Sequence, residues 1–387
     1  MSAARELGHA ADCRFVSASP ASSVAGATES YTATKRRLRA KAPGNPLEAV
    51  TMANRLTRSW RPLLWPLIVM GLVHAAQAAD GPVRPTDKPL LWMIDTQPPS
   101  YLYGTIHVPD ERVLALPDIV ERAFAASDVV CTEIPLDAGL VLRAQQQLML
   151  PPDTSMRDLL PEALYTRLDR YLQAKGLNAA AFDRFKPWVL LSQLTMLDYM
   201  QRRASHESLD EMLWNRAKAR RKQVAALETI DEQFAVFDSL THAEQATLIG
   251  STLDLLEKAE AEGRSYIEDM VRGYLTGDEE RLQKMMTEYI DPDDAAHQKL
   301  LRVLVQERDV RMAERIVEKL KAAPDKAHFF AAGALHFGGP ESIDAHLRKA
   351  GMKVRRLTPE DIDKLPRPRR ERPQREQAPR EPAGVTP

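Results

Sequence analysis

Residues 327–336 read AHFFAAGALH, a short apolar run that ends on a histidine. Short apolar runs of this kind are typical of strands buried inside a sheet. Three further segments have the same character: residues 101–107, 128–134 and 223–228. The four runs carry an ionisable side chain at or next to their carboxyl ends, namely His107, Glu133, Glu228 and His336. Ligands of open α/β sheets bind beyond the carboxyl ends of strands, so we expect these side chains to meet at a functional site.

The other strand and helix signals predict an α/β fold. Residues 90–94 are separated from residues 101–107 by the turn signal Gln97-Pro98-Pro99-Ser100, which predicts a hairpin. Residues 353–357 predict an edge strand. Helical periodicity predicts helices over residues 117–126, 162–174, 187–202, 209–219, 243–260, 279–289 and 293–321. Strands at both ends of a helical middle predict a central mixed sheet with a large helical insertion.

Residues 52–78 have the three parts of a secretory signal peptide. The positive region contains Arg55, Arg58 and Arg61. The apolar run at residues 62–73 is shorter than the roughly 20 residues that span a bilayer, and Ala76-Gln77-Ala78 matches a cleavage site. We therefore expect a periplasmic or secreted protein. An uncleaved signal anchor is the alternative, and it is the one predicted route to a membrane.

The rest of the chain divides into a leader, a folded domain and a tail. A signal peptide normally begins a protein, so we expect Met52 to be the true start and residues 1–51 to be a start-site error. A disordered N-terminal extension is the alternative. Residues 79–357 predict one large domain. Residues 358–387 are rich in Pro, Arg and Glu and poor in apolar side chains, which predicts a disordered tail.

Charge argues against a nucleic-acid-binding protein, and cysteine content excludes a domain stabilised by its own disulfides. The chain has 53 Lys and Arg and 54 Asp and Glu, and residues 1–78 hold ten of the basic and four of the acidic ones, so the remainder is acidic. An acidic surface argues against nucleic-acid binding, which depends on phosphate neutralisation. Cys131 is the one cysteine after residue 78, so the domain cannot contain an intramolecular disulfide. Its apolar strand context predicts a core residue rather than a nucleophile.

The two histidines share a local pattern, Gly104-Thr105-Ile106-His107 and Gly333-Ala334-Leu335-His336. A glycine in a strand lets a backbone or ligand approach closely. Two imidazoles and a carboxylate are a usual ligand set for a divalent transition metal with open positions. We predict a metal site made of His107, His336 and Glu133, with their nitrogen and oxygen atoms within roughly 3–5 Å of one another. Taken alone, either histidine could instead be a capping or core residue.

Three further residues are predicted to support this site. Arg308 interrupts the apolar stripe of the helix at 293–321, and a buried guanidinium requires an acidic partner such as a strand-end glutamate or a substrate carboxylate. Alternatively, the Arg308 side chain could extend along the helix so that its guanidinium group reaches solvent at the rim. Asp210 lies just after Ser208, at the predicted start of a helix. Either Asp210 or Glu228 is predicted to act as a supporting carboxylate or as a general base.

These residues resemble the TraB/GumN family, which includes the membrane-anchored Tiki-type proteases. The resemblance is carried by YLYGTIHVPD (101–110), VVCTEI (129–134), SLDEMLWNRAKARRKQVAALET (208–229), YLTGD (274–278), QERDVRMAERI (306–316) and FFAAGALHFGGPESI (329–343). Together these segments cover nearly all of residues 90–357. The family usually has Arg-Asn where this chain has Arg308-Asp309, so the arginine is kept and the asparagine is replaced.

The resemblance implies an erythromycin-esterase or Tiki-like α/β fold. It also implies a peptidase that depends on manganese or cobalt, with zinc as a further candidate, and that requires His107, Glu133 and His336. Glu133, Glu228, Arg308 and Asp210 are the candidate catalytic residues.

Three hypotheses for function follow. The first is an exported metal-dependent hydrolase, a peptidase, that acts on a peptide or small molecule. The second is a metal-independent, esterase-like hydrolase in which a histidine acts as the base and Glu and Arg position the substrate. The third is a non-catalytic binding or scaffolding protein of the cell envelope, linked to polysaccharide or peptide export.

Overall fold

The computed structural model describes residues 88–197 and 207–367, which all belong to the unit Asn54–Pro387. The predicted leader (1–51), the predicted signal peptide (52–78) and the end of the predicted tail (368–387) lie outside the described residues. In the part of the chain that is described, no helix has the length and apolar character needed to cross a membrane.

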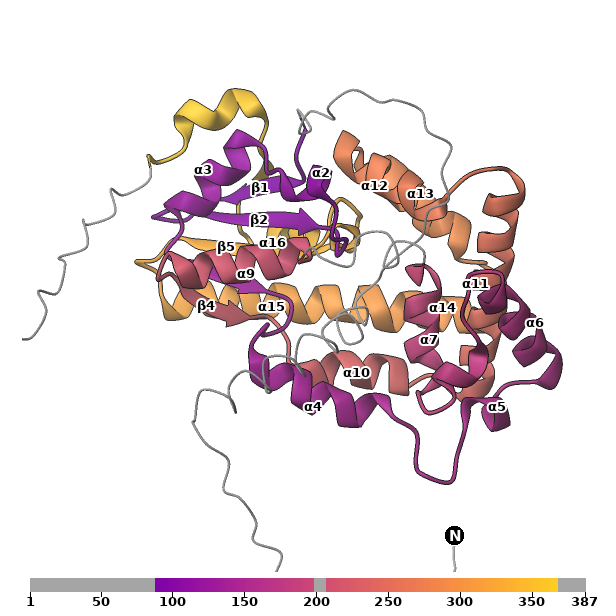
Figure 1. The fold of residues 1–387 in the computed structure, drawn as a ribbon. Helices are drawn as coiled ribbons and strands as arrows, with labels where there is room; N and C mark the ends of the chain where they lie inside the picture. Colours follow the sequence, from indigo (N-terminus) through magenta and orange to yellow (C-terminus); the bar gives the residue numbers. More distant parts are fainter. Residues whose placement is uncertain (1–87, 198–206, 368–387) are drawn as a thin grey trace, which may run out of the picture. The chain divides into compact units, whose positions relative to one another are not determined.

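A mixed six-stranded sheet lies at the centre of the fold (Figure 1). Its strands are β1 (Leu91–Ile94), β2 (Ser100–Thr105), β3 (Val129–Thr132), β4 (Gln223–Ala226), β5 (His328–Gly333) and β6 (Val354–Arg356). Their spatial order is β4-β3-β5-β2-β1-β6. The first four strands in this order are parallel, and β1 is antiparallel to both β2 and β6. The predicted hairpin, the edge strand at β6 and the buried strands β2, β3 and β5 are confirmed. The prediction of a buried strand at 223–228 is wrong, because β4 lies at the other edge of the sheet and its residues are exposed or half-buried.

Fourteen labelled α-helices surround the sheet in the described residues. They are α2 (Glu111–Leu114), α3 (Asp118–Ala126), α4 (Ala138–Leu148), α5 (Met156–Leu159), α6 (Glu162–Gln173), α7 (Pro187–Leu194), α9 (Leu209–Ala219), α10 (Ile230–Asp238), α11 (His242–Ala261), α12 (Tyr266–Thr276), α13 (Glu279–Tyr289), α14 (Ala295–Leu301), α15 (Glu307–Ala322) and α16 (Ile343–Lys349). Shorter turns are η2 (Ala179–Phe182), η4 (Ala334–His336) and η5 (Pro359–Lys364), and η3 (Arg302–Gln306) is a π-helical segment.

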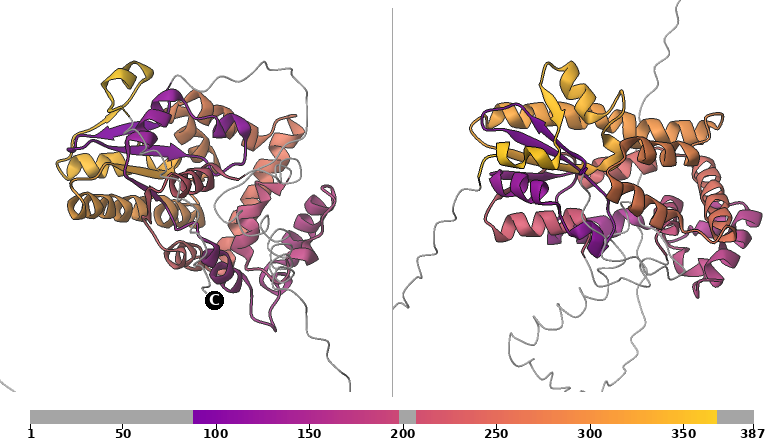
Figure 2. Two further views of the ribbon diagram at one scale, coloured as in Figure 1. Left: turned by 60° about the vertical axis from the view of Figure 1, so that its left-hand side comes forward. Right: turned by 90° about the horizontal axis from the view of Figure 1, so that it is seen from above.

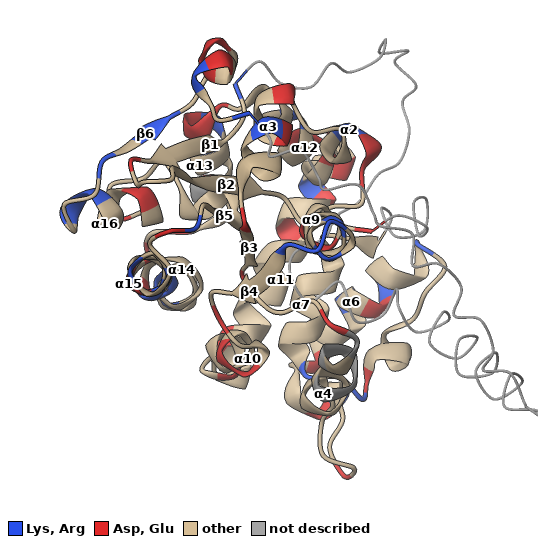
Figure 3. Cartoon of the chain, turned by 90° about the vertical axis from the view of Figure 1, so that its left-hand side faces the viewer, with Lys and Arg blue, Asp and Glu red and all other residues tan. Residues whose placement is uncertain are grey.

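The helices cover both faces of the sheet. Figure 3 shows α15 and α16 on one side and α3 and α9 on the other. The central strands β2, β3 and β5 are accordingly buried along nearly their whole length, as expected of parallel strands covered on both faces. The other helices, α4 to α7 and α10 to α14, gather largely beyond the carboxyl ends of the parallel strands (Figures 1 and 2). This arrangement confirms the predicted α/β sheet with helical insertions, and it places a helical wall around the strand ends.

Several predicted elements have bounds that differ from their prediction. The helix predicted over 187–202 ends at Leu194 as α7, and residues 198–202 lie outside the described residues. The strand predicted to reach His336 stops at Gly333, and Ala334–His336 forms the short turn η4. The Gly333 backbone N–H donates to the Glu133 carboxylate at 2.7 Å instead of to a neighbouring strand, which ends the ladder there. The helix predicted over 293–321 begins at Ala295 and contains the π-helical segment η3 before α15.

The folded part also extends beyond the boundary predicted at Leu357. Residues 359–364 form η5, which is opened by Thr358, and Leu365 behind it is buried. Asp361 accepts from Arg355 and Lys364, which fixes this turn against β6. A predicted disordered tail starting at residue 358 is therefore wrong for residues 358–365, because Leu365 provides the apolar anchor that the remaining Pro- and Arg-rich sequence lacks.

Candidate functional site

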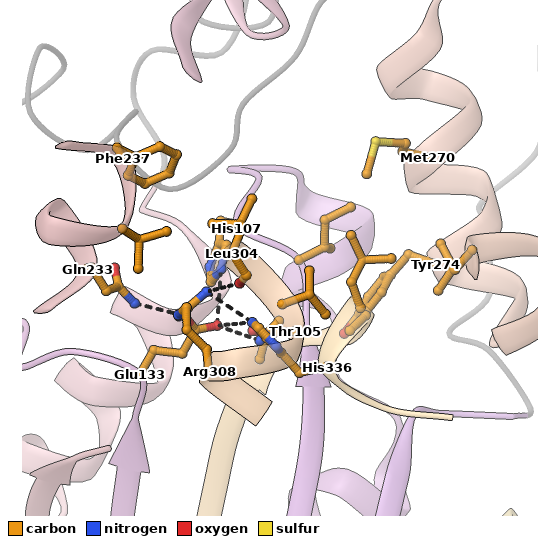
Figure 4. Close-up of a pocket in the computed structure, with 17 residues that line it drawn as sticks. Thr105, His107, Glu133, Gln233, Phe237, Met270, Tyr274, Leu304, Arg308 and His336 are labelled. Atoms are coloured by element: carbon orange, nitrogen blue, oxygen red, sulfur yellow. Dashed lines mark hydrogen bonds and ion pairs between the residues drawn. The ribbon is translucent and has the colours of Figure 1, made fainter. Parts of the chain in front are cut away.

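The ionisable residues that follow β2, β3 and β5 come together at one end of the sheet (Figure 4). The Nε2 atom of His107 lies 3.6 Å from Oε1 of Glu133, and Nε2 of His336 lies 4.0 Å from the same oxygen. These distances fall within the predicted range of roughly 3–5 Å. Glu133 and His336 are buried, and the His107 side chain is 15% exposed. The sequence-based prediction of one convergent cluster is therefore confirmed as geometry.

The two glutamates are neighbours because the β3–β4 ladder continues past the ends of both strands. The Glu228 N–H donates to the Glu133 carbonyl at 2.7 Å, so the parallel pairing extends to these residues. Both side chains are then brought to the same edge of the sheet. Each glutamate is about 3% exposed, which makes a cation partner a structural requirement.

Each histidine is oriented by its own aspartate. His107 Nδ1 contacts Oδ2 of Asp210 at 2.5 Å, and His336 Nδ1 contacts Oδ1 of Asp309 at 2.5 Å. The Thr105 hydroxyl donates to the other oxygen of Asp210 at 2.9 Å, which ties the end of β2 to the start of α9. In both cases the carboxylate holds Nδ1 and leaves Nε2 directed toward Glu133. Carboxylate support of this kind fixes the orientation and tautomer of metal-binding histidines.

The electrostatics of the cluster keep Glu133 ionised. Burial alone would raise the pKa of Glu133, but the charge of Arg308 and the hydrogen bond from His107 outweigh it and hold the pKa well below its usual range. Burial lowers the pKa of His107, yet Asp210 and Glu133 together raise it to about 10. The ligand-free chain therefore carries a carboxylate at Glu133 and a protonated imidazole at His107 at neutral pH.

Arg308 connects the site to α15. Its Nε and Nη2 atoms donate to one oxygen of Glu228 at 2.9 and 2.7 Å, and Nη2 also contacts Glu133. Nη1 lies 3.2 Å from Nε2 of His336. The side chain is only 6% exposed, so the predicted pairing with strand-end glutamates is confirmed and the alternative of reaching the helix rim is wrong.

The two glycines of the G-x-x-H pairs leave room for different neighbours. A side chain on Gly104 would begin 2.9 Å from Cβ of Leu90 and 3.3 Å from Cα of Ala334. The absence of a side chain therefore lets the segments at Leu90 and Ala334 pack closely against the Gly104 backbone. A side chain on Gly333 would lie 3.3 Å from Oε1 of Glu133 and 3.6 Å from Nε2 of His107. Gly333 thus keeps open the space between the candidate ligands.

A pocket that is partly open to solvent leads to this cluster. Its floor is polar and consists of the histidines, Glu133, Arg308 and nearby groups. Its walls are apolar and come largely from η3, η4, α10, α12 and α13: Val236, Phe237, Met270, Tyr274, Leu282, Leu304, Val305, Ala334 and Leu335. Phe237 and Met270 stand on opposite sides in Figure 4.

The donor set suits a divalent transition metal. Two imidazole nitrogens and one ionised carboxylate face one another, both Nδ1 atoms are supported by carboxylates, and Gly333 leaves the space between them free. Among the described residues, no group of three His, Cys, Asp or Glu side chains is already arranged around a common ion position. Arg308 gives a physical reason, because its guanidinium contacts both Glu133 and His336.

Sequence reasoning missed two residues that shape the site. Asp309 was noted for replacing an asparagine but was given no role, and it orients His336. Gln233 donates to the Glu133 carboxylate at 2.9 Å. A signal for Gln233 was available, because it shares the apolar face of α10 with Ile230 and Phe234. Asp309 is adjacent to the buried Arg308, but its contact with His336 spans 27 residues and has no local pattern.

Known proteins match this chain over the region that carries the site. The TraB/PrgY/gumN family matches residues 90–356. Metalloprotease TIKI1 of Homo sapiens is 31% identical over 310 residues, which cover 68% of this chain and 61% of the relative. Metalloprotease TIKI2 of Danio rerio is 29% identical over 335 residues, which cover 74% of this chain and 65% of the relative. The chain thus spans less than two thirds of the length of these relatives. No solved structure matches it significantly.

Proposed function

The chain belongs to the TraB/PrgY/gumN family, and from this premise we propose that it is a metal-dependent hydrolase that cleaves peptides. The observation that carries the proposal is the convergence of two aspartate-supported histidines on Glu133 beside a pocket. The similarity to proteins named metalloproteases supports the choice of reaction.

His107, His336 and Glu133 would hold the ion through two Nε2 atoms and a carboxylate oxygen. A bound divalent ion supplies Lewis-acid polarisation of a carbonyl and lowers the pKa of a water molecule. Manganese or cobalt is our first choice of metal, and zinc is the next. Asp210 and Asp309 keep the imidazoles in the orientation that exposes Nε2. Gln233 fixes the second oxygen of Glu133 from α10.

Glu228 acts as a positioning residue in this proposal. One of its oxygens accepts from Arg308 and the other accepts from Arg311 at 2.6 Å, so both are occupied by guanidinium groups. A carboxylate held in this way is not free to turn toward a water molecule in the pocket. Glu228 instead fixes Arg308, whose donors face the pocket floor and could position a substrate carbonyl or carboxylate.

The apolar walls of the pocket support a substrate with an apolar side chain near the scissile bond. An apolar wall discriminates against a charged group, which would lose its hydration without gaining a partner. Phe237 and Leu304 are partly exposed and can contact such a side chain. We therefore expect peptides with apolar residues next to the cleaved bond to be cleaved faster than peptides with acidic residues there.

The metal-independent alternative is less well supported. It requires a neutral histidine that can accept a proton from water. The pKa of His107 is raised to about 10, mainly through Asp210, so this imidazole is already protonated at neutral pH. At His336, Nε2 is occupied by the guanidinium group of Arg308. A metal ion can displace that proton, whereas a general base cannot use an occupied nitrogen.

Hydrolysis and metal binding by the purified full chain test the proposal. We expect Mn²⁺, Co²⁺ or Zn²⁺ to raise the melting temperature and to support peptide cleavage that a chelator abolishes. The double variant His107→Ala, His336→Ala should lose both effects. His242→Ala is the matched control, because His242 is exposed at the start of α11 and does not line the pocket. Chelator-resistant cleavage would favour the metal-independent hydrolase. If the double variant behaves like the wild type in all assays, the binding or scaffolding hypothesis is favoured.

We also propose that the chain is exported through residues 52–78. N-terminal sequencing of the protein recovered from a periplasmic fraction should begin at Ala79. Recovery only from the cytoplasm, with residues 52–78 still attached, would contradict this proposal.

A further inference from the structure

Arg308 contacts the atom that His336 would need for metal binding. The guanidinium group contains only donors, so Nε2 of His336 accepts from Nη1 at 3.2 Å and the imidazole proton lies on Nδ1, toward Asp309. The lone pair on Nε2 is the one that a metal ion would use. In this structure the guanidinium therefore occupies the nitrogen atom that would be a ligand in the proposed metal site.

Arg308 also neutralises the carboxylate that a metal ion would need. Glu133 and Glu228 are both buried, and Arg308 contacts both. An unpaired buried carboxylate is costly, so the metal-free fold depends on this cation. A divalent ion bound to Glu133 would perform the same neutralisation and would lie close enough to the guanidinium to repel it. The two cations thus compete for Glu133 and His336.

The guanidinium has a second set of partners that does not include either metal-binding residue. Its Nε and Nη2 donate to Glu228, and Nη1 donates to the Leu304 carbonyl at 3.0 Å. Leu304 lies in the π-helical segment η3, a type of irregularity that is frequent at functional sites. Arg308 can therefore release Glu133 and His336 and still keep three hydrogen bonds.

We propose that Arg308 is an exchangeable cation, which holds Glu133 and His336 in the metal-free chain and yields both to the incoming divalent ion. This inference rests on the metal-dependent function proposed above. After the exchange Arg308 remains attached to Glu228 and to the Leu304 carbonyl, beside the pocket floor.

Arg308→Gln in the full chain tests the exchange, with Arg311→Gln as the matched control. Arg311 donates to the same Glu228 but has no hydrogen bond or ion pair with Glu133 or His336. We expect Arg308→Gln to lower the melting temperature of the metal-free protein and to tighten Mn²⁺ binding by ~10-fold or more, because a repelling charge is removed. The Mn²⁺-induced rise in melting temperature should therefore be larger than in the wild type. Arg311→Gln should leave the Mn²⁺ dissociation constant within ~2-fold of the wild type, because Arg311 contacts neither Glu133 nor His336 and its half-buried charge is partly screened by solvent.

The measurements are calorimetric Mn²⁺ titration and thermal melting with and without Mn²⁺. Weaker Mn²⁺ binding by Arg308→Gln would overturn the inference and make Arg308 a residue that positions Glu133 for the metal. Absence of Mn²⁺ binding in both the wild type and Arg308→Gln would instead overturn the proposed metal-dependent function. If Arg308→Gln does not fold, Arg308→Lys tests the loss of the contacts to Glu133 and His336 while the charge is kept. A single ammonium cannot reach all the partners of the guanidinium, so this variant should also bind Mn²⁺ more tightly than the wild type.

Discussion

The two G-x-x-H segments have the same spacing but different structures. Residues 106–107 follow β2 without regular secondary structure, whereas residues 334–336 form the short turn η4 directly after β5. His107 is the more exposed histidine and is supported by α9, and His336 is more buried and is supported by α15. Nevertheless, both present Nε2 to the same oxygen of Glu133. The comparison teaches that the two segments share their endpoint, an Nε2 atom with an aspartate behind the imidazole, and not their backbone path.

The first way to break this comparison is to remove one histidine at a time. If both histidines are ligands of one ion, His107→Ala and His336→Ala should each weaken Mn²⁺ binding by ~100-fold or more. Loss of a direct ligand should cost at least as much as loss of a residue that orients a ligand. Calorimetric titration of each variant measures this, with His242→Ala as the control for an exposed histidine. Loss of binding in only one of the two variants would mean that the segments are not equivalent.

The supporting aspartates sharpen the comparison. Asp210→Asn and Asp309→Asn should each reduce Mn²⁺ affinity by ~10–100-fold, because the amide keeps the shape but removes the charge that fixes each imidazole. The Asp210 variant should show the additional effect of a weakened Thr105 contact. Melting curves without metal provide the control for folding. An unchanged affinity in Asp309→Asn would show that η4 alone orients His336.

The two glycines should separate stability from binding. Gly104→Ala should destabilise the fold by ~1–3 kcal/mol, because the new Cβ meets Cβ of Leu90 at 2.9 Å. Gly333 has φ −52°, which any residue adopts, so Gly333→Ala introduces no backbone strain and should lower the melting temperature less than Gly104→Ala does. It should weaken Mn²⁺ binding several-fold, because the methyl group enters the space between Glu133 and His107. The reverse pattern, with a destabilised Gly333→Ala, would show that this glycine serves the fold.

The same comparison explains how much the sequence predicts. Strand-end side chains were predictable because an apolar run that finishes on a charge is a local pattern, and the parallel sheet then brings such ends together. Arg308 was predictable as a buried cation because it interrupts the apolar stripe of Met312, Ile316 and Leu320. Its partners could be named only as a class, since which glutamate it reaches depends on the pairing of β3 with β4.

Other features depend on tertiary structure. The turn η4 was missed because residues 334–336 continue the apolar pattern of β5, and it is the side chain of Glu133 that takes the Gly333 N–H and ends the strand. The helices α10 and α12 were not predicted, and both contribute walls to the pocket. Asp309 was undervalued because its role exists only once α15 packs beside η4.

Substitution of Cys131 should have the smallest effect on binding and hydrolysis. It tests whether the functional site includes residues inside β3 or begins only after the strand. Cys131 precedes Glu133 by two residues and is fully buried, and burial raises the pKa of its thiol to about 12. At pH 8 only about one thiol in 10,000 would then be ionised, and the thiolate is the reactive form.

A Cys13→Ser background leaves Cys131 as the single cysteine of the full chain. In this protein a maleimide should react at least ~100-fold more slowly in the native state than in urea. Cys131→Ala should retain Mn²⁺ binding and hydrolysis, apart from a slight loss of stability. Rapid native labelling, or loss of activity in Cys131→Ala, would move the boundary of the site two residues into the strand and make the thiol part of it.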